Sequence, residues 1–337
     1  MKKHATIKDV AKQAGVSIST VSRAMNDLDR VSDEVRKRVK DAAQQLNYVP
    51  NSIAVSMVKG RTKNILVVVP DIINEYYTSV VHGVEEVMSD RGYTTIVYAS
   101  NSEKEKEAEL FTGPLAKIID GAIVVPACVN TEVYKQFGKP IILVDRYITA
   151  SGLPGVVIDN FGGSYQIVKL LMEKGHRDVG IIIGELTFNI GQERYMGYEQ
   201  ALKEYGVSVN NDYVVHGDWY RETGYDGMKK LLAMENKPTA VFATNNLLCI
   251  GCIEALKDEG LVAGKDISLV GFDDHILASF VDNGITVVAR PMVEMGVVAA
   301  EKLFSALKGK NIDAKDVLNV SIMERGSIVD INNTNIQ

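Results

Sequence analysis

The sequence predicts an α/β protein with an all-α N-terminal headpiece: a helix-turn-helix segment followed by a two-lobed body built on doubly wound parallel sheets. Three observations predict this fold class. From residue 62 onward, short β-branched runs alternate with longer amphipathic stretches. Two short amphipathic segments separated by a glycine precede them. The charge also differs in sign between these two regions.

Length and charge set the domain organisation. The 337 residues, 46% of them hydrophobic, are enough for two compact α/β lobes and a small additional domain. Residues 1–61 hold 12 Lys and Arg against 6 Asp and Glu, a net of +6, whereas the whole chain carries −6. The remainder therefore carries −12. A basic module joined to an acidic body predicts that the first module meets a polyanion.

The N-terminus and the cysteines both favour a cytoplasmic protein. The chain runs from Met1 into polar sequence without an apolar signal segment, and no stretch reaches the roughly 20 apolar residues of a membrane span. Three cysteines are too few for a disulfide framework. Cys249 and Cys252 form a Cys-x-x-Cys inside an apolar helical run, with no second cysteine pair nearby. We interpret them as helix-packing residues rather than a metal or redox site.

The alternating region predicts ten strands with helices between most of them. The predicted strands are Ile65–Pro70, Thr94–Ala99, Ala122–Val125, Pro140–Val144, Val156–Ile158, Val179–Ile183, Val214–His216, Ala240–Ala243, Ile267–Val270 and Ile285–Ala289. The predicted helices include Ser79–Arg91, Gly163–Lys174, Glu193–Tyr205, Glu222–Met234 and Leu247–Glu259. Continuous apolar strands suit sheets that are covered on both faces.

Polar residues directly after strands are the candidates for ligand binding, because ligands of such sheets lie beyond the carboxyl ends of the strands. They are Asp71, Asn74, Asp145, Arg146, Asp218, Trp219, Asn245, Asn246, Asp273 and Asp274. Capping of the following helix is the alternative role for the acids. The phosphate-binding, nucleophile-elbow and zinc-protease motifs are missing, and the five histidines are scattered. We therefore expect no catalytic residue, metal or cofactor.

The first sixty residues predict three helices. Thr6 and Asp9 give the first a capping-box-like start, and Gly15 breaks it. Ser17 caps the second helix, which runs to Met25 with Val21 and Met25 facing inward. Its outward positions are Ile18, Ser19, Ser22 and Arg23, and the third helix runs from Ser32 to Leu46. This is the helix-turn-helix plan, in which the second helix enters the DNA major groove.

The same residues resemble a known family. Thr6-Ile7-Lys8-Asp9-Val10-Ala11, Ala14-Gly15-Val16-Ser17, Thr20-Val21-Ser22-Arg23 and Asn26 resemble the LacI/GalR family of bacterial repressors, and Tyr48-x-Pro50-Asn51-x-x-Ala54 resembles its hinge segment. The resemblance covers essentially the whole chain. It implies a sequence-specific transcriptional regulator, a repressor, with a periplasmic-binding-protein-like sensor.

The resemblance also implies which residues bind double-stranded operator DNA. By position, Ile18, Ser19 and Arg23 would read bases, with Thr6, Ser17, Thr20, Ser22 and Asn26 holding phosphates. An arginine can grip guanine O6 and N7 with two hydrogen bonds. The hinge supplies Tyr48, Asn51, Ala54 and Met57. Residues 51–58 should fold only on DNA, where Met57 would wedge into a base step in place of the family's usual leucine.

The sensor positions that match the family's effector site are Asn74, Tyr76, Tyr77, Asp145, Arg194, Trp219, Asn245 and Asp273. Carboxylates, an arginine and an amide suit vicinal hydroxyls, and a tryptophan face suits the C–H side of a sugar. We expect a sugar or sugar phosphate as the allosteric effector. Cleft packing for Trp219 and a lobe–lobe ion pair for Arg194 are the structural alternatives. Asn246 stands where the family usually has aspartate.

Three other classes of protein share features with this sequence. Catabolite control proteins take a phosphorylated carrier protein as corepressor, but this chain has Glu301 where they present an arginine. A solute-binding transport protein would share the two-lobed fold but would need export and lack a headpiece. A nucleotide-binding α/β enzyme would turn over sugars or nucleotides. Because the chain ends without leucine heptads, we expect a homodimer on a near-palindromic operator, with no membrane partner.

The expected domain boundaries follow from these assignments. They are a headpiece at 1–49, a hinge helix and linker at 50–61, a sensor N-lobe at 62–158 with 289–321, a C-lobe at 159–288 with 322–330, and a polar tail at 331–337.

Overall fold

The computed structural model describes residues 5–25, 31–48, 61–281 and 283–334. Contacts divide the chain into two units, residues 1–63 and 64–337, and each is described by itself. The predicted hinge helix at 51–58 lies outside the described residues. Within the described part of the chain, no helix is both long and apolar enough to cross a bilayer.

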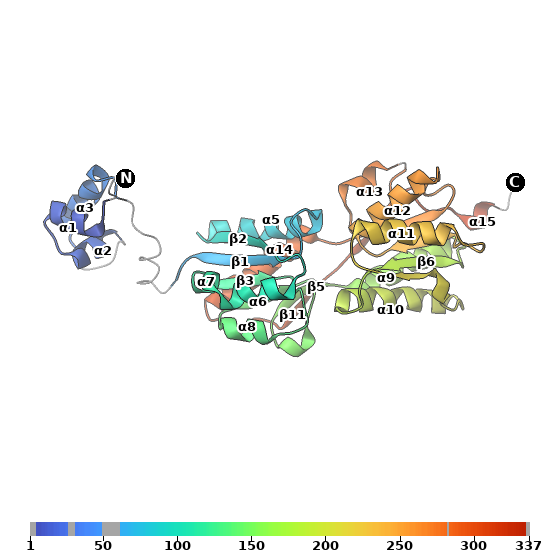
Figure 1. Cartoon of the computed structure of the whole chain (residues 1–337), viewed down its shortest axis with the longest axis horizontal. Coiled ribbons are helices and arrows are strands. Elements are labelled where there is room, and N and C mark those ends of the chain that lie inside the picture. The colour runs from blue at the N-terminus through green and yellow to red at the C-terminus, as the bar shows by residue number, and fades with distance from the viewer. Residues whose placement is uncertain (1–4, 26–30, 49–60, 282, 335–337) are drawn as a thin grey trace. The chain divides into compact units, whose positions relative to one another are not determined.

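The first unit contains the three predicted helices, α1 (Ile7–Ala14), α2 (Ile18–Met25) and α3 (Asp33–Gln45) (Figure 1). The backbone N–H and the hydroxyl of Thr6 donate to the Asp9 carboxylate at 2.8 and 2.7 Å, which fixes the start of α1. Gly15 ends α1 in the left-handed conformation, with φ of 65°. The helices enclose a small core made of Val10, Ala11, Ala14, Val21, Ala24, Val39, Ala42 and Ala43.

The second unit begins with a six-stranded, all-parallel sheet in the order β11-β5-β4-β3-β1-β2. Its strands are β1 (Asn64–Val69), β2 (Thr94–Ala99), β3 (Gly121–Val124), β4 (Ile141–Val144), β5 (Gly155–Ile158) and β11 (Lys315–Leu318). Its helices are α5 (Glu75–Asp90), α6 (Lys104–Thr112), α7 (Pro114–Lys117), α8 (Glu132–Phe137) and α14 (Met292–Leu307), with the 3₁₀ turn η1 (Thr149–Ser151).

Helices cover both faces of this sheet, as the continuous apolar strands predict. Alternate residues of β1 divide between two cores: Ile65, Val67 and Val69 pack with α5 and α14, and Leu66 and Val68 pack with α6 and α8. Helices α5 and α14 cross closely at paired glycines. A Cβ on Gly83 would lie 2.1 Å from the Val293 carbonyl oxygen, and one on Gly296 would lie 2.1 Å from that of Val80.

The second sheet repeats this plan in the order β12-β10-β9-β8-β6-β7, with only the β10–β12 pair antiparallel. Its strands are β6 (Val179–Ile183), β7 (Val214–His216), β8 (Ala240–Ala243), β9 (Ser268–Phe272), β10 (Thr286–Ala289) and β12 (Ser321–Met323). Its helices are α9 (Asn160–Glu173), α10 (Asn189–Glu204), α11 (Arg221–Leu232), α12 (Asn246–Asp258), α13 (Ile276–Phe280) and α15 (Ile331–Thr334), with η2 (Asn211–Tyr213). Cys249 and Cys252 are buried on α12 in its core, as expected for helix-packing residues.

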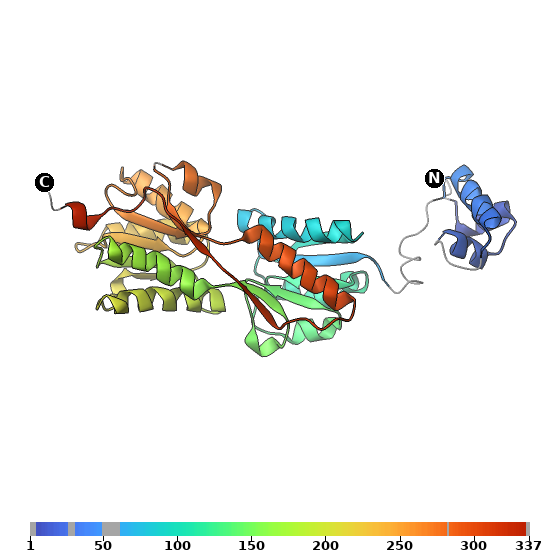
Figure 2. The same cartoon turned by 180° about the vertical axis from the view of Figure 1, so that it is seen from behind.

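The chain passes from one sheet to the other three times: after β5, after β10 and between β11 and β12. Figure 2 shows α14 lying across the first sheet and the C-terminal strand segment running from that sheet to the second. Ala289 ends β10 and Ser321 begins β12. Both therefore belong to the second sheet, although the predicted N-lobe includes them.

The predicted strands are all present, and four have the predicted bounds. Several helices begin earlier than predicted, because polar caps extend them. The Asn74 side chain accepts a hydrogen bond from the Tyr76 N–H at 3.0 Å, which starts α5 at Glu75 rather than Ser79. Asp159 similarly accepts from the Gly162 N–H at 2.8 Å and starts α9 at Asn160 rather than Gly163.

Candidate functional site

The second helix of the headpiece presents the predicted base-reading side chains to solvent. Ser17 caps α2, since its hydroxyl accepts a hydrogen bond from the Thr20 N–H at 3.1 Å. Val21 and Ala24 are buried, whereas Ile18, Ser19 and Arg23 are exposed on the other side. An exposed isoleucine at the start of such a helix leaves an apolar surface uncovered within the unit. This arrangement fits insertion into a major groove.

The other predicted DNA-binding residues divide into two groups. Thr6 is exposed at the start of α1, and Ser22 and Thr20 are half-buried. Tyr48 packs against the small headpiece core, so its ring also supports the fold. The remaining four, Asn26, Asn51, Ala54 and Met57, lie outside the described residues.

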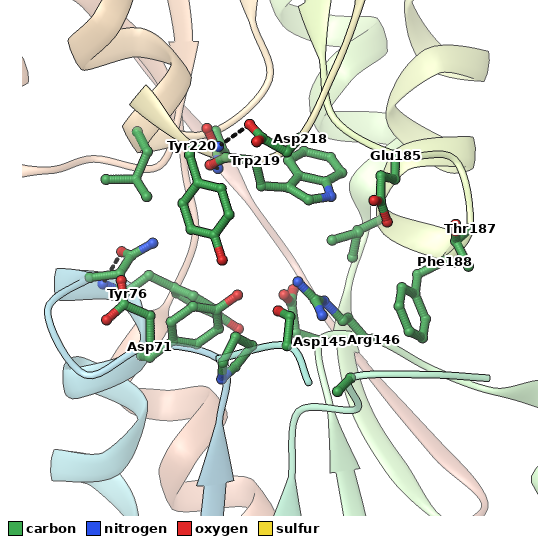
Figure 3. A pocket seen from close by; sticks show the side chains of 18 of the residues that line it. Asp71, Tyr76, Asp145, Arg146, Glu185, Thr187, Phe188, Asp218, Trp219 and Tyr220 are labelled. Atoms are coloured by element: carbon green, nitrogen blue, oxygen red, sulfur yellow. Dashed lines mark hydrogen bonds between the residues drawn. The ribbon is translucent and has the colours of Figure 1, made fainter. Parts of the chain in front are cut away.

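The two lobes enclose a cavity of about 400 Å³ at the carboxyl ends of the strands. All eight predicted effector residues line it, and they come from both lobes: Asn74, Tyr76, Tyr77, Asp145, Arg194, Trp219, Asn245 and Asp273. Figure 3 shows Trp219 and Tyr220 on one side of this cavity facing Tyr76 and Asp145 on the other. The volume suits a ligand of monosaccharide to disaccharide size.

Two buried carboxylates occupy equivalent positions in the two sheets. Asp145 follows β4 and Asp273 follows β9, and each of these strands lies third from the same end of its sheet order. Both residues have left-handed backbones, with φ of 66° and 74°. Both backbone N–H groups bond to the strand alongside, to Val156 at 3.0 Å and to Val288 at 2.8 Å. The strand ends therefore place one acid from each lobe at the cavity.

Arg290, which the sequence prediction omitted, joins these two acids. Its Nη1 lies 2.7 Å from an Asp145 oxygen, and its Nη2 and Nε lie 2.9 and 2.5 Å from the two oxygens of Asp273. Its guanidinium also lies 3.3 Å from the centre of the Tyr76 ring. Burial alone would lower the pKa of Arg290, but Asp273, the Tyr76 hydroxyl and Asp145 raise it above its usual value. The three residues form a buried ion triad between the lobes.

Arg194 remains partly free for a ligand. Its Nε donates to Asn160 at 2.9 Å and its Nη1 to the Thr244 carbonyl at 2.6 Å. Its Nη2 has no hydrogen-bond partner among the described residues. Burial, followed by the nearby Arg290, lowers the pKa of Arg194 to about 10. The sequence left a lobe–lobe ion pair as the alternative role of Arg194. In the structure, Arg290 makes that ion pair and Arg194 does not.

The amides at the rim are largely committed to the fold. Asn245 caps α12 through the Leu248 N–H at 2.7 Å and donates to the Trp219 carbonyl at 3.0 Å. Asn74 accepts from Asn246 of the other lobe at 2.8 Å as well as capping α5. These bonds leave each side chain with fewer groups for a ligand than the sequence prediction assumed. Asn246, noted in the sequence as unusual, instead contributes an amide contact between the lobes.

The chain matches known proteins along nearly its whole length. A model described as bacterial regulatory proteins of the lacI family matches residues 6–51, and one described as a periplasmic binding protein-like domain matches residues 168–328. The HTH-type transcriptional regulator RegA of Clostridium saccharobutylicum is 35% identical over 329 residues, which cover 96% of this chain and 99% of that protein. This chain belongs to the LacI family of bacterial regulatory proteins.

Two solved structures of the family have the same fold. A lac repressor dimer bound to operator and the anti-inducer ONPF is 23% identical, with a TM-score of 0.84 over 97% of this chain and 100% of that one. A complex of the transcriptional regulator CelR with cellobiose is 30% identical, with a TM-score of 0.71 over 96% and 99%. As a LacI-family member, this chain is a DNA-binding transcriptional regulator with a helix-turn-helix and two parallel-sheet lobes.

Sequence reasoning missed several residues that line the cavity. Arg290 follows β10 directly, so the strand-end rule should have included it. Arg146 was noted after its strand but was not assigned to the site. Phe188 and Ile190 come from the loop and helix after β6, yet they pack into the core of the first lobe. No pattern in the sequence marks such a side chain as crossing from one lobe to the other.

Proposed function

We propose that this regulator is a repressor that binds a near-palindromic operator as a homodimer, and that a sugar or sugar phosphate in the interlobe cavity controls its DNA affinity. The observation that carries the proposal is the cavity itself. Groups from both lobes converge in it, so a ligand there interacts differently with the open and closed arrangements of the lobes. The cellobiose complex of CelR supports a carbohydrate.

The side-chain chemistry of the cavity favours a polyhydroxylated ligand. Arg194 offers a free N–H edge, and the Trp219 indole provides a flat apolar surface in the same cavity. We assign ligand binding to the eight predicted residues, with Arg290 added to them. DNA binding is assigned to Ile18, Ser19 and Arg23 as base readers and to the other predicted headpiece and hinge residues as supporting contacts.

An exposed apolar patch supports the homodimer. The patch consists of Ile72, Ile73, Ile276, Leu277 and Phe280, and Ile73 and Phe280 are 89% and 77% exposed. It spans both lobes, because the Ile276 N–H of α13 lies 3.4 Å from the Glu75 carboxylate at the start of α5. Clustered apolar side chains of this kind mark association surfaces. A second copy of the chain is the occupant that a two-fold operator requires.

The alternative of a phosphorylated carrier protein as corepressor is less well supported. Glu301 on α14 pairs with Arg91, the residue directly after α5, and the Glu301 side chain is 51% exposed. An acid at this position repels a phosphate group rather than binding it. No catalytic role is proposed, and a regulator of this kind acts in the bacterial cytoplasm, on the nucleoid when it is bound to its operator.

The test starts from the operator. Selection from random duplex DNA yields a binding sequence, and fluorescence anisotropy then measures affinity for it at fixed salt with a panel of sugars and sugar phosphates. We expect one compound to change the affinity at least tenfold. Arg194→Ala should abolish that change while leaving effector-free affinity within a few-fold of wild type. A full response in Arg194→Ala would place the effector elsewhere.

Asp273→Ala is a poorer test of effector binding than Arg194→Ala. Asp273 bonds to Arg290 and so contributes to the tie between the lobes. Its removal should alter the equilibrium between the lobe arrangements as well as ligand binding. Arg194, whose side-chain hydrogen bonds remain within its own lobe, separates the two effects.

A further inference from the structure

Arg146 is a buried cation that faces the cavity without a counter-ion. The residue is 6% exposed and lines the cavity directly after β4. Its Nη1 donates to the Pro126 carbonyl at 3.0 Å, and its Nε has no hydrogen-bond partner among the described residues. The ring of Phe188 lies 5.1 Å from the guanidinium carbon. Figure 3 shows Arg146 beside Phe188 with its nitrogens toward the open part of the cavity.

The contrast with Arg290 in the same cavity is informative. Arg290 has a carboxylate from each lobe within 2.7 Å, whereas no carboxylate in the described part of the chain lies within 4.0 Å of the Arg146 guanidinium. A buried charge without a partner is costly, so such groups are usually paired. The protein neutralises Arg290 with two carboxylates and leaves Arg146 without one.

Two of the acids close to this wall are already engaged, and Asp71, Glu185 and Asp218 also line the cavity without pairing with Arg146. Asp145 is held by Arg290. Glu107, buried behind this wall, accepts hydrogen bonds from the Ala127 N–H at 2.9 Å and the Tyr134 hydroxyl at 2.6 Å. Burial raises the pKa of Glu107, whereas these two hydrogen bonds and the charge of Arg146 lower it. The positive charge therefore remains directed at the cavity.

A second cation lines the same cavity, at the start of α6. Lys104 lines the cavity at the first turn of α6, a nine-residue helix, and no carboxylate is paired with it in the described part of the chain. The N-terminus of a helix carries partial positive charge. Ser102, just before this helix, adds a hydroxyl to the cavity lining. The cavity lining thus holds a second cation, Lys104, and a hydroxyl, although the first turn of α6 also carries Glu105 and Glu107.

We propose that Arg146, with Lys104 as a second cation of the cavity lining, binds an anionic group of the effector, a phosphate or a carboxylate. This inference rests on the proposed function, because it concerns the same cavity, and it narrows the ligand to a sugar phosphate or a sugar acid. The opposite side, with Trp219 and Arg194, then receives the neutral part of the ligand. Arg146 selects between charged and uncharged members of one sugar series.

The first experiment uses inorganic phosphate as the probe on the full-length protein. Thermal unfolding is followed against phosphate concentration, with total ionic strength held constant by sodium chloride. We expect a saturable rise in Tm for wild type that is lost in Arg146→Gln and retained in Lys135→Gln. Lys135 is a matched control because it is an exposed cation of the same lobe that pairs with Glu132 outside the cavity.

The second experiment uses isothermal titration calorimetry with matched pairs: glucose 6-phosphate with glucose, ribose 5-phosphate with ribose, and galacturonate with galactose. We expect the charged member of a binding pair to bind at least tenfold more tightly than the neutral one. Arg146→Gln should remove that preference and leave the neutral member within about threefold of wild type. Arg146→Lys should retain part of it, since a lysine keeps the charge but loses the planar fork. A change in packing alone would weaken both members of a pair equally.

Several results would overturn the inference. A phosphate effect that is absent, or equal in wild type and Arg146→Gln, would mean that phosphate binds only adventitiously. Equal or tighter binding of the neutral sugar would contradict the proposed anionic subsite. It would remain compatible with the proposed function of a sugar-responsive regulator. The proposed function fails by a different result, namely no preference of the full-length protein for any selected DNA sequence over random DNA.

Discussion

Asp145 and Asp273 hold their carboxylates at the cavity from backbones that few residues adopt. A left-handed conformation strains most side chains by about 1–3 kcal/mol, although aspartate and asparagine tolerate it better than others. The ion pairs with Arg290 offset this strain in both lobes. Strained backbones of this kind are concentrated at functional sites, so the two strand ends support a binding role for this cavity.

Arg23 should contribute to base recognition rather than to general DNA affinity. It is exposed on α2, on the side opposite the buried Val21 and Ala24. Arg23→Ala should weaken operator binding by roughly 1–3 kcal/mol, because a two-pronged contact to guanine is lost, with little effect on random DNA. Anisotropy titrations with both duplexes at one salt concentration measure the difference. Equal losses on both would assign Arg23 to phosphate contact instead.

His176 should make the stability of the second lobe dependent on pH. Its ring bonds to Thr239 at 2.8 Å and to Ser268 at 2.9 Å, and burial lowers its pKa below 6.5. Between that lowered pKa and 6.5, the unfolded chain binds a proton that the folded chain does not. The free energy of unfolding should therefore fall as the pH drops below 6.5, and be independent of this group above it.

Urea denaturation at pH 7.5, 6.5 and 5.5 measures this dependence. His176→Gln should flatten the decline between pH 6.5 and 5.5, and the exposed His82→Gln serves as its control. The remaining slope belongs partly to His275, whose pKa is also lowered by burial. An unchanged slope in His176→Gln would contradict the prediction.

At the residue scale, the sequence predicted the lining of the cavity better than its internal bonding. The strand-end rule and the family resemblance together placed all eight predicted residues at the cavity. Neither could show that Asp145 and Asp273 would bond to the same arginine. Asp145 lies 128 residues before Asp273, and Asp273 lies 17 residues before Arg290, so only the fold brings the three side chains together. Pairings of this kind depend on how two lobes meet.

The strand-to-helix junction at Arg290 is the element that ties the two sheets. Arg290 lies between β10 of the second sheet and α14, which packs on the first. Replacing it by methionine would leave two buried carboxylates without a counter-ion. Arg290→Met should lower the free energy of unfolding by about 3–5 kcal/mol, the usual effect of breaking a buried ion pair by removing one partner.

The control for this variant is Arg325→Met, which breaks a more exposed pair with Asp274. Exposed pairs contribute about 1 kcal/mol or less, so Arg325→Met should have the smaller effect. Urea denaturation at pH 7 compares the two variants with wild type. Equal losses would mean that the buried triad contributes no more than a surface ion pair.

The elements that the sequence missed share a physical cause. β11 and β12 are edge strands of three to four residues with half-exposed, partly charged sequences such as Lys315-Asp316-Val317-Leu318. The apolar-run criterion finds strands that are buried on both faces, and these two are not. Helix starts were placed late for a related reason, since asparagine and aspartate caps carry no apolar periodicity.

For the whole molecule, the apolar patch that spans both lobes should control assembly. Phe280→Glu places a charge on its most prominent aromatic side chain without disturbing the core, because that side chain is 77% exposed. Size-exclusion chromatography with light scattering should show a dimer for wild type and a shift toward monomer for the variant. Operator affinity should fall with it, since two headpieces no longer act together. A dimer of unchanged stability in Phe280→Glu would place the interface on another surface.

The fold of the second unit as a whole was predictable, because strand and helix alternation specifies a doubly wound sheet almost independently of detail. The headpiece plan was predictable from its glycine turn and caps. The strand that completes each sheet was not predictable from the sequence. β11 and β12 come from the last part of the chain and join sheets whose other strands lie much earlier in it.

That late return has a consequence for synthesis on the ribosome. The first sheet receives its edge strand β11 only from residues 315–318, and its covering helix α14 from residues 292–307. A nascent chain that has released β1 to β5 still exposes the apolar face that α14 later covers, and this face stays uncovered while β6 to β10 of the second sheet are translated. The N-terminal lobe therefore completes its fold only after most of the second lobe has been made, although its own synthesis begins first. Arrested chains ending before residue 292 should remain sensitive to protease in this lobe, and chains released at full length should not.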